Sequence, residues 1–324
     1  LFASPALFIL RDTKKEVGIC LVFLIMPLLF YIYGSTYKET FLASDIINYD
    51  YKVRVIGTNI SLDRFYSNIE PVSVIKDLID ISDPNKNEKT IFIWPEGILP
   101  DISQKELVEY KWLFENKFNE NHLLVIGINS QIFKDGNINY FNSFSIYDQN
   151  LSLLHAYNKI NLVPFGEFLP FENILKTIGL RVITNNYQSF SRGNKREIIE
   201  INREGFSFKI LPLICYEIIY SGKLFRSQNF DLIINISEDG WFGKSIGPKQ
   251  HFVHSIFRAV ESGKYILRSA NNGIAAIINP LGIVEQKIKF GTSGYIDFNE
   301  ARKIQPTAFS KYGNKIFIIL IFLY

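Results

Sequence analysis

Three side chains in this sequence form a set that can carry out acyl-transfer chemistry. They are Glu96, Lys159 and Cys215, and each comes just after a strand-like run. Carboxyl ends of strands are where open α/β sheets build their sites. A cysteine nucleophile needs a base to take its proton, which a carboxylate of raised pKa can supply. It also needs positive charge beside the developing oxyanion, which an ammonium provides.

The spacing of these residues is weak evidence on its own, because long stretches of chain separate them. Surface positions are the ordinary alternative for Glu96 and Lys159, and a buried core thiol is the alternative for Cys215. Cys215 ends the apolar run 206–214 and precedes a possible helix start. Backbone N–H groups at such a turn lower a thiol's pKa and donate to an oxyanion, so the position favours chemistry.

The composition limits the classes of protein that fit. The chain has 324 residues, of which 47% are hydrophobic, enough for one large domain or two small ones. The net charge is only +3 and the basic residues are scattered, so we expect no nucleic-acid partner. Cys20 and Cys215 are too few for a disulfide framework. The four histidines make no recognisable zinc motif, and we expect no metal or other cofactor.

Strand-like and helical patterns alternate along the chain, which indicates an α/β fold with layered sheets. Apolar residues at helical spacing predict helices over 72–79, 104–118 and 251–262. Apolar and β-rich runs predict strands over 51–58, 90–93, 123–128, 140–147, 151–157, 206–214, 231–236, 265–268, 274–278 and 283–288.

A long uncharged run over residues 17–34 predicts a transmembrane helix. Arg11, Lys14 and Lys15 precede it and place that loop in the cytoplasm, with the following chain across the membrane. A buried core helix and a cleavable signal peptide are the alternatives. The apolar segment before the loop argues against a signal peptide.

Both ends of the chain are also predicted to belong to membrane segments. Residues 1–16 are interpreted as the end of a preceding membrane segment and its loop, and 315–324 as the start of a C-terminal transmembrane helix or a core strand. The catalytic domain is expected over 46–308. The chain begins at Leu1 without an initiator Met, so we expect an N-terminally truncated or processed chain.

Several stretches resemble the nitrilase, or carbon–nitrogen hydrolase, superfamily. Its three signatures match Trp94-Pro-Glu96, Asn158-Lys159 with Pro164-Phe-Gly-Glu167, and Cys215-Tyr-Glu217. Downstream stretches resemble, in order, those of the apolipoprotein N-acyltransferase family within it. They are Ser237-Glu-Asp-Gly-Trp-Phe-Gly243, Gly247-Pro-Lys-Gln-His251, Arg258-Ala-Val-Glu261 and Arg268-Ser-Ala-Asn-Asn-Gly273.

This resemblance implies an αββα sandwich with flanking transmembrane helices. It assigns Glu96 as base, Lys159 as oxyanion stabiliser and Cys215 as nucleophile. It also implies a supporting or substrate-binding role for Glu167, Tyr216 and Glu217. The alternatives are a solvated loop charge for Glu167 and a helix N-terminal charge for Glu217.

The implied activity is transfer of a fatty acyl chain from a phospholipid to the α-amine of a diacylglyceryl-cysteine lipoprotein through a cysteine thioester. The implied location is the bacterial inner membrane, as a multi-pass monomer with its catalytic domain in the periplasm. Two alternatives stay open. One is a nitrilase-type amidase that hydrolyses a small amide, and the other is an inactive truncated remnant.

Aromatic residues near the signatures mark a candidate substrate surface. The family usually has a Trp shortly after its first strand, where this chain has Tyr66 or Phe65. Trp241 and its neighbour Phe242 suit either an acyl pocket or the core. The apolar loop 165–180 suits a lipid surface, or packs on the domain.

Overall fold

The computed structural model describes residues 14–66, 70–99, 101–134, 136–171, 174, 177, 179, 189–203, 205–222, 224, 229–315 and 318. The chain divides into two compact units. The first comprises Leu1–Ile47 and Arg302–Ile304, and the second comprises Asn48–Ala301 and Gln305–Tyr324.

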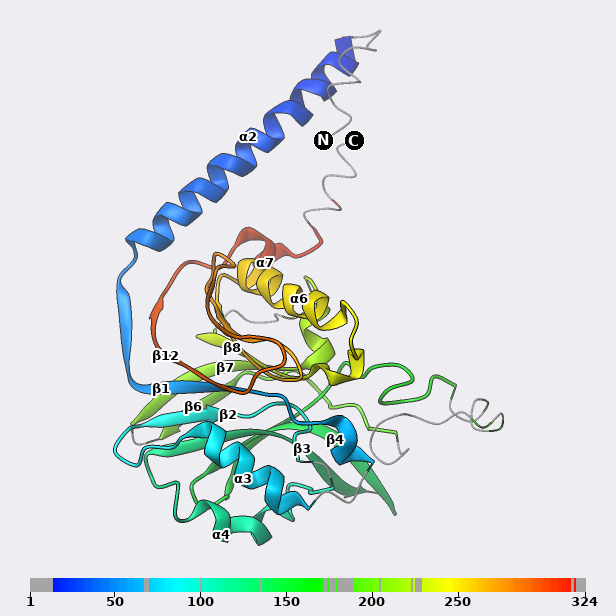
Figure 1. The fold of residues 1–324 in the computed structure, drawn as a ribbon. Helices are drawn as coiled ribbons and strands as arrows, with labels where there is room; N and C mark the ends of the chain where they lie inside the picture. Colours follow the sequence, from blue (N-terminus) through cyan, green and yellow to red (C-terminus); the bar gives the residue numbers. More distant parts are fainter. Residues whose placement is uncertain are drawn as a thin grey trace. The chain divides into compact units, whose positions relative to one another are not determined.

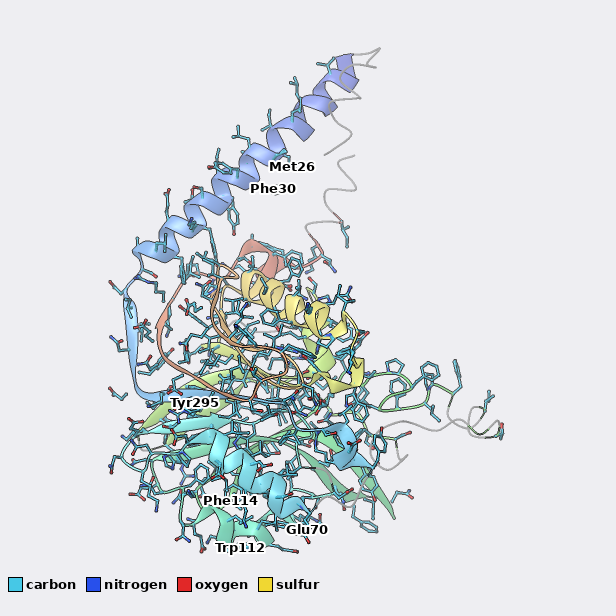
Figure 2. All side chains as sticks on the ribbon, viewed as in Figure 1. Met26, Phe30, Glu70, Trp112, Phe114 and Tyr295 are labelled. Atoms are coloured by element: carbon cyan, nitrogen blue, oxygen red, sulfur yellow. The ribbon has the colours of Figure 1, made fainter. Side chains whose placement is uncertain are left out.

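The first unit contains the long helix α2, Lys14–Ala43, which includes Pro27. Apolar side chains such as Phe30 project from it into solvent (Figure 2). Within the part of the chain that is described, no helix is long and apolar enough to cross a membrane. The membrane span expected over 17–34 therefore stays a prediction. The expectations for 1–13 and for most of 315–324 fall outside the described residues.

The second unit contains the sheet and its covering helices. The strands are β1 Ile46–Thr58, β2 Thr90–Ile93, β3 His122–Lys134, β4 Asn137–Asp148, β5 Leu153–Asn158, β6 Ile199–Arg203, β7 Phe206–Ile214, β8 Leu232–Glu238, β9 Tyr265–Asn271, β10 Ala275–Ile278, β11 Val284–Ile288 and β12 Gly294–Arg302. The α-helices are α3 Pro71–Ser82, α4 Lys111–Phe114, α6 Gly247–Ser262 and α7 Ala308–Tyr312. Short 3₁₀ helices are η1 Leu62–Phe65, η2 Leu107–Tyr110, η4 Cys215–Ile219 and η5 Asp239–Phe242.

The strands run in the order β5-β4-β3-β2-β1-β9-β8-β7-β6. β1 pairs with β2 over Lys52–Val55, but it pairs with β9 only at Gly57 and Thr58. This short junction joins two halves of the sheet. β4 and β7 contact each other although they are far apart in the strand order, so the two halves face each other. Helices α3 and α4 cover one outer face and α6 covers the other (Figure 1).

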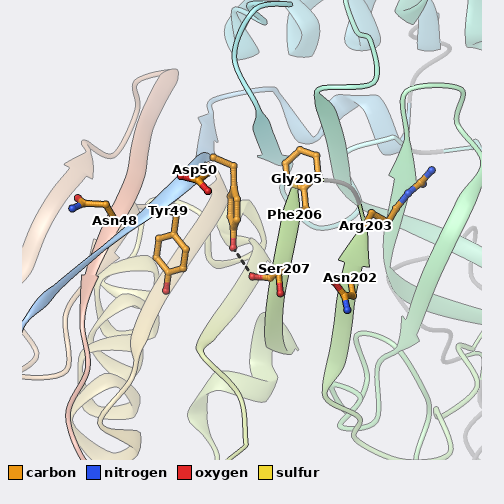
Figure 3. Close-up of a pocket in the computed structure, with 9 residues that line it drawn as sticks. Asn48, Tyr49, Asp50, Asn202, Arg203, Gly205, Phe206 and Ser207 are labelled. Carbon is orange, nitrogen blue, oxygen red and sulfur yellow. Dashed lines mark hydrogen bonds between the residues drawn. The ribbon is translucent and has the colours of Figure 1, made fainter.

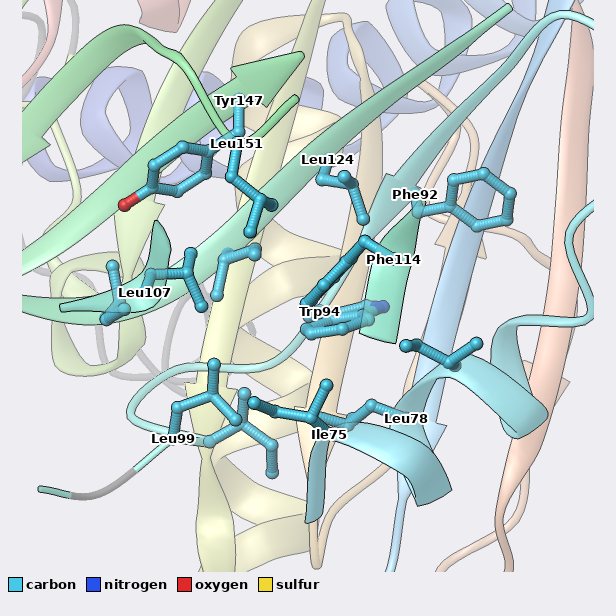
Figure 4. Close-up of a cluster of buried hydrophobic side chains, with 14 of the residues drawn as sticks. Ile75, Leu78, Phe92, Trp94, Leu99, Leu107, Phe114, Leu124, Tyr147 and Leu151 are labelled. Atoms are coloured by element: carbon cyan, nitrogen blue, oxygen red, sulfur yellow. The ribbon is translucent and has the colours of Figure 1, made fainter. Parts of the chain in front are cut away.

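A hydrophobic core fixes α3 and α4 on their half of the sheet. Ile75 and Leu78 of α3 are buried one helical turn apart, as the spacing predicted. They pack with Phe114 of α4 and with Trp94, which directly follows β2 (Figure 4). The Trp94 indole N–H donates to the Ser82 hydroxyl at 2.9 Å. This packing fixes the end of β2, from which Glu96 emerges.

The helix predicted over 104–118 is wrong in extent. The segment instead forms η2 followed by the single turn of α4. Before η2, the Glu106 carboxylate accepts the backbone N–H of Ser103 at 2.7 Å, and Ser103 bridges to Asn129 of β3. These bonds hold the start of the segment to the sheet edge, so a continuous helix does not begin there. Strands β6 and β12 were not predicted.

Candidate active site

The three candidate catalytic residues follow the ends of three strands. Glu96 comes three residues after β2 ends, Lys159 follows β5, and Cys215 follows β7. β2 and β5 belong to one half of the folded sheet and β7 to the other. The facing of the two halves therefore brings together residues that are distant in the sequence.

Lys159 is a buried cation held between two carboxylates. Its ammonium donates to Glu96 Oε1 at 3.0 Å and to Glu167 Oε1 at 2.9 Å. The Asn142 amide N–H₂ donates to the same two oxygens, at 2.7 and 2.9 Å. Burial alone would lower the pKa of Lys159, but Glu167 and Glu96 outweigh it and raise that pKa well above its usual value.

Glu96 is fixed from the other side by the backbone. Its Oε2 accepts the backbone N–H of Glu238 at 2.9 Å, a bond that crosses between the halves of the sheet. A Cβ at Gly127 of β3 would lie 2.5 Å from the Glu96 Cα. Only glycine therefore lets β3 run this close to the turn that carries the carboxylate.

Cys215 sits on a strained turn between β7 and η4. Its φ of +47° is unusual for a residue with a Cβ, and its thiol is free and buried. Burial, and next the Glu96 carboxylate, raise its pKa well above the usual value, against the lowering effects of Lys159 and the Ser237 hydroxyl. The expected lowering of this pKa at a helix start is therefore wrong. A single 3₁₀ turn does not offset the desolvation of a buried thiolate.

Glu217 ties the Lys159 loop to the Cys215 turn. Its Oε1 accepts bonds from the Tyr157 hydroxyl at 2.8 Å and from the backbone N–H groups of Ile160 and Asn161 at 3.0 and 3.2 Å. Arg196 Nη2 donates to the same oxygen at 3.0 Å. Its Oε2 accepts the backbone N–H that directly precedes Cys215, at 2.9 Å. Glu217 is fully buried among these donors.

The remaining candidate residues are aromatic. Tyr66 is 60% exposed and meets Trp241 edge-on, with ring centroids 6.5 Å apart. Trp241 also lies against the ring of Phe65 at 5.1 Å. Tyr216 instead packs edge-on with Tyr220 at 5.7 Å. The structure therefore brings Tyr66 and Trp241 together and pairs Tyr216 with a different ring.

Sequence reasoning missed several buried polar residues near the three candidate catalytic residues. Asn142 lies inside β4, where an alternating strand pattern gave no sign that its amide bridges two carboxylates. Asp239 and Arg268 lie in stretches that had been matched only as part of the family pattern. His251 was matched only as part of a family stretch and was not proposed as a metal ligand. Its partner is the carboxylate of Asp239, and no described cluster of His, Cys, Asp and Glu could hold a metal ion.

A pocket of about 400 Å³ lies elsewhere in the second unit, beside the first part of β1 and the β6–β7 hairpin (Figure 3). Tyr49, Tyr51 and Arg203 are among its lining residues. The Tyr51 hydroxyl donates to the Ser207 carbonyl at 3.0 Å. The pocket lining includes none of the three candidate catalytic residues.

The chain is similar to known proteins in both sequence and structure. A family model described as carbon-nitrogen hydrolase matches residues 90–299. An apolipoprotein N-acyltransferase of Bradyrhizobium diazoefficiens is 29% identical over all of this chain and 62% of its own length. One from Rickettsia prowazekii is 34% identical over 84% of this chain and 55% of its own. The chain thus spans little more than half the length of these curated relatives.

Among solved structures, a mutant amidase of Nesterenkonia AN1 from the nitrilase superfamily superposes with a TM-score of 0.53. The match covers 86% of this chain and 99% of that one, at 12% identity. This likeness shows a nitrilase-like α/β fold.

Proposed function

Because the chain belongs to the carbon–nitrogen hydrolase family, we propose that Glu96, Lys159 and Cys215 are catalytic and transfer acyl groups. One observation carries the proposal. A buried ammonium, bonded to the Glu96 and Glu167 carboxylates, lies beside a buried thiol on a strained turn. In this arrangement, the proposed base and the proposed electrophilic stabiliser contact each other. Both act electrostatically on the proposed nucleophile.

We propose that the acyl donor is a phospholipid and that the acceptor is the α-amine of a diacylglyceryl-cysteine lipoprotein. The names of the curated relatives support this choice over the hydrolysis of a small amide. The apolar residues Phe165, Phe171 and Ile174 are 53%, 82% and 66% exposed in the loop before β6, which suits a lipid surface. No cofactor takes part in the proposed chemistry.

In the first half-reaction, the Cys215 sulfur attacks the ester carbonyl of the phospholipid. The raised pKa of Cys215 keeps the resting thiol protonated, so Glu96 must take the proton as the sulfur attacks. The Lys159 ammonium stabilises the oxyanion that forms. Collapse of this intermediate breaks the ester C–O bond and leaves a thioester, and the lysophospholipid oxygen takes the proton from Glu96.

In the second half-reaction, the lipoprotein amine attacks the thioester. Glu96 accepts a proton from the amine, and the C–S bond breaks as the amide forms. The proton returns to the Cys215 sulfur, which restores the resting thiol. This is ping-pong chemistry, and it requires that water be kept from the thioester until the amine arrives. The burial of Cys215, at 8% exposure, suits that requirement.

We propose that the full protein is a monomeric multi-pass protein of the bacterial inner membrane, with the catalytic domain in the periplasm. The basic residues Arg11, Lys14 and Lys15 before residues 17–34 support this orientation, although Lys14 and Lys15 lie in the first turn of α2 and not in the expected loop. A reporter fused after Asn299 tests it. Reporter activity in the cytoplasm would overturn the orientation and favour an amidase.

The decisive test is incubation of the full chain with phospholipid and no acceptor, followed by intact mass measurement. We expect one added acyl chain that hydroxylamine removes and that disappears when a lipopeptide amine is added. Cys215→Ala should show no adduct. Steady release of free fatty acid without an adduct would show hydrolysis instead, and no reaction of any kind would fit an inactive remnant.

A further inference from the structure

A second buried polar cluster converges on the carboxylate of Asp239, outside the three catalytic residues. The Ser237 hydroxyl donates to Asp239 Oδ1 at 2.7 Å, and His251 Nδ1 meets the same oxygen at 2.8 Å. Arg268 Nη2 donates to Oδ2 at 2.8 Å and to Oδ1 at 3.0 Å. The four side chains come from β8, η5, α6 and β9 and are all at least nine-tenths buried.

Two members of this cluster act on Cys215, at different atoms. The Ser237 hydroxyl lowers the pKa of the thiol. His251 Nε2 faces the backbone carbonyl oxygen of Cys215 at 3.2 Å. Through Ser237 and His251, Asp239 is thus linked to both the side chain and the backbone of Cys215.

The backbone contact falls where the chain is strained. A non-glycine residue at positive φ costs of order 1–3 kcal/mol and persists only when its surroundings hold it. Cys215 has a φ of +47°, and His251 holds the carbonyl on its C-terminal side. Glu217 holds the backbone N–H on its N-terminal side, at Ile214.

We propose that Ser237, Asp239 and His251 form a positioning clamp that aims the Cys215 sulfur and assists its deprotonation, with Arg268 fixing Asp239. The proposal deepens the function proposed above, because it rests on Cys215 as the nucleophile. The three clamp residues act through Cys215 and do not themselves contact substrate.

The hydrogen-bond geometry fixes the protons in this clamp. Desolvation is outweighed by Arg268 and His251, so the pKa of Asp239 falls to about 2 and its carboxylate only accepts. The Cys215 carbonyl also only accepts. His251 lies between these two acceptors, and Arg268 Nη2 also faces its Nδ1, at 3.2 Å.

The single hydroxyl hydrogen of Ser237 has two uses. In the resting thiol, the hydroxyl donates to Asp239. When Glu96 has taken the thiol proton, the hydroxyl can turn and donate to the thiolate. Removal of this donor should therefore raise the pKa of the Cys215 thiol, whereas removal of His251 should loosen the backbone without that effect.

Alkylation of Cys215 by iodoacetamide tests the sulfur branch, the effect of Ser237 on the thiol, without any lipid substrate. Acyl transfer tests the backbone branch, the contact of His251 with the Cys215 carbonyl. The experiment uses the full chain with Cys20→Ala, so that Cys215 is the sole thiol, and follows the rate against pH by mass spectrometry. Ser237→Ala should move the midpoint of this profile to higher pH and slow alkylation about tenfold below it, and Ser237→Thr should restore the profile. His251→Leu should slow acyl transfer about tenfold with no shift of the midpoint, and His251→Gln should recover part of the rate.

Ser255→Ala is the matched control, because the Ser255 hydroxyl is equally buried and has no hydrogen-bond partner among the described residues. It should leave both readouts unchanged. An unshifted midpoint in Ser237→Ala, with a thermal unfolding curve like that of the parent, would overturn the sulfur branch. Normal acyl transfer in a folded His251→Leu would overturn the backbone branch. Because alkylation needs no lipid, a shifted midpoint in a protein that transfers no acyl chain would reject the proposed function and leave the clamp standing.

Discussion

Two buried carboxylate regions contact the Lys159 loop, and they differ in what bonds to them. Glu96 and Glu167 share the Lys159 ammonium, which donates to both carboxylates. Glu217 instead accepts five bonds, three of them from backbone N–H groups. Donors of that kind fix a carboxylate in place and cannot exchange protons with a substrate. The comparison suggests that the Lys159 region serves reaction rate and the Glu217 region serves stability.

The largest expected effect is at the proposed nucleophile, Cys215. Cys215→Ala should abolish acyl transfer and leave the free energy of unfolding nearly unchanged, because a small buried thiol contributes little packing. Transfer to a lipopeptide and urea unfolding measure the two quantities. Cys20→Ala is the control and should be silent in both. Appreciable acyl transfer by Cys215→Ala would contradict the proposed role of Cys215 as the nucleophile, on which the comparison rests.

Lys159→Arg comes next. Arginine keeps the charge, but its planar fork does not fit a buried site shaped for an ammonium between two carboxylates. We expect kcat to fall about 10²–10³-fold, the size of loss seen when an oxyanion donor is removed. A fall of less than about tenfold, or about 1.4 kcal/mol in the barrier, would contradict the catalytic assignment.

Glu217→Gln should show the opposite pattern, with a larger loss of stability than of reaction rate. The amide keeps one acceptor oxygen and places an N–H₂ group where donors already converge. Breaking this buried ion pair with Arg196 should cost about 3–5 kcal/mol of unfolding free energy. Glu96→Gln is the matched control, and it should lose more rate and less stability than Glu217→Gln. If the two variants lost rate and stability in the same proportion, the division between the regions would fail.

The sequence identified the candidate catalytic residues but not the polar residues around them. Glu96, Lys159 and Cys215 were proposed because each sits in a short motif at a strand end, and local order is enough to recognise such a motif. Asn142 and Asp239 were missed because their roles arise only in tertiary packing, which brings Asn142 beside Glu96 and Glu167 in one half of the sheet and Asp239 beside His251 and Arg268 in the other. The direction of the Cys215 pKa was missed for a related reason. Burial of the thiol depends on that packing and outweighs the local turn geometry.

Acid should weaken the cluster around Asp239. Its carboxyl pKa is lowered from 3.8 to about 2 in the folded protein, so the folded state favours the ionised form. The resulting stability is fully present above about pH 4 and is lost as the pH falls toward 2, and it amounts to about 2 kcal/mol. Asp239→Asn should remove this part of the pH dependence in urea unfolding. If the loss of unfolding free energy at low pH were unchanged in that variant, other carboxyl groups would be responsible for it.

The smallest expected effect is at the exposed aromatic residues, which belong to neither buried region. Trp241 is 36% exposed and lies against Phe65 and Tyr66. If these rings line the approach of an acyl chain, Trp241→Ala should raise KM for phospholipid a few-fold and leave iodoacetamide alkylation of Cys215 unchanged. Trp112→Ala is the matched control, because this 55% exposed Trp lies on α4, on an outer face of the sheet (Figure 2). An equal rise in KM for both variants would mean that any exposed Trp has this effect. Slower alkylation in Trp241→Ala would instead assign Trp241 to the support of the nucleophile, together with the buried residues.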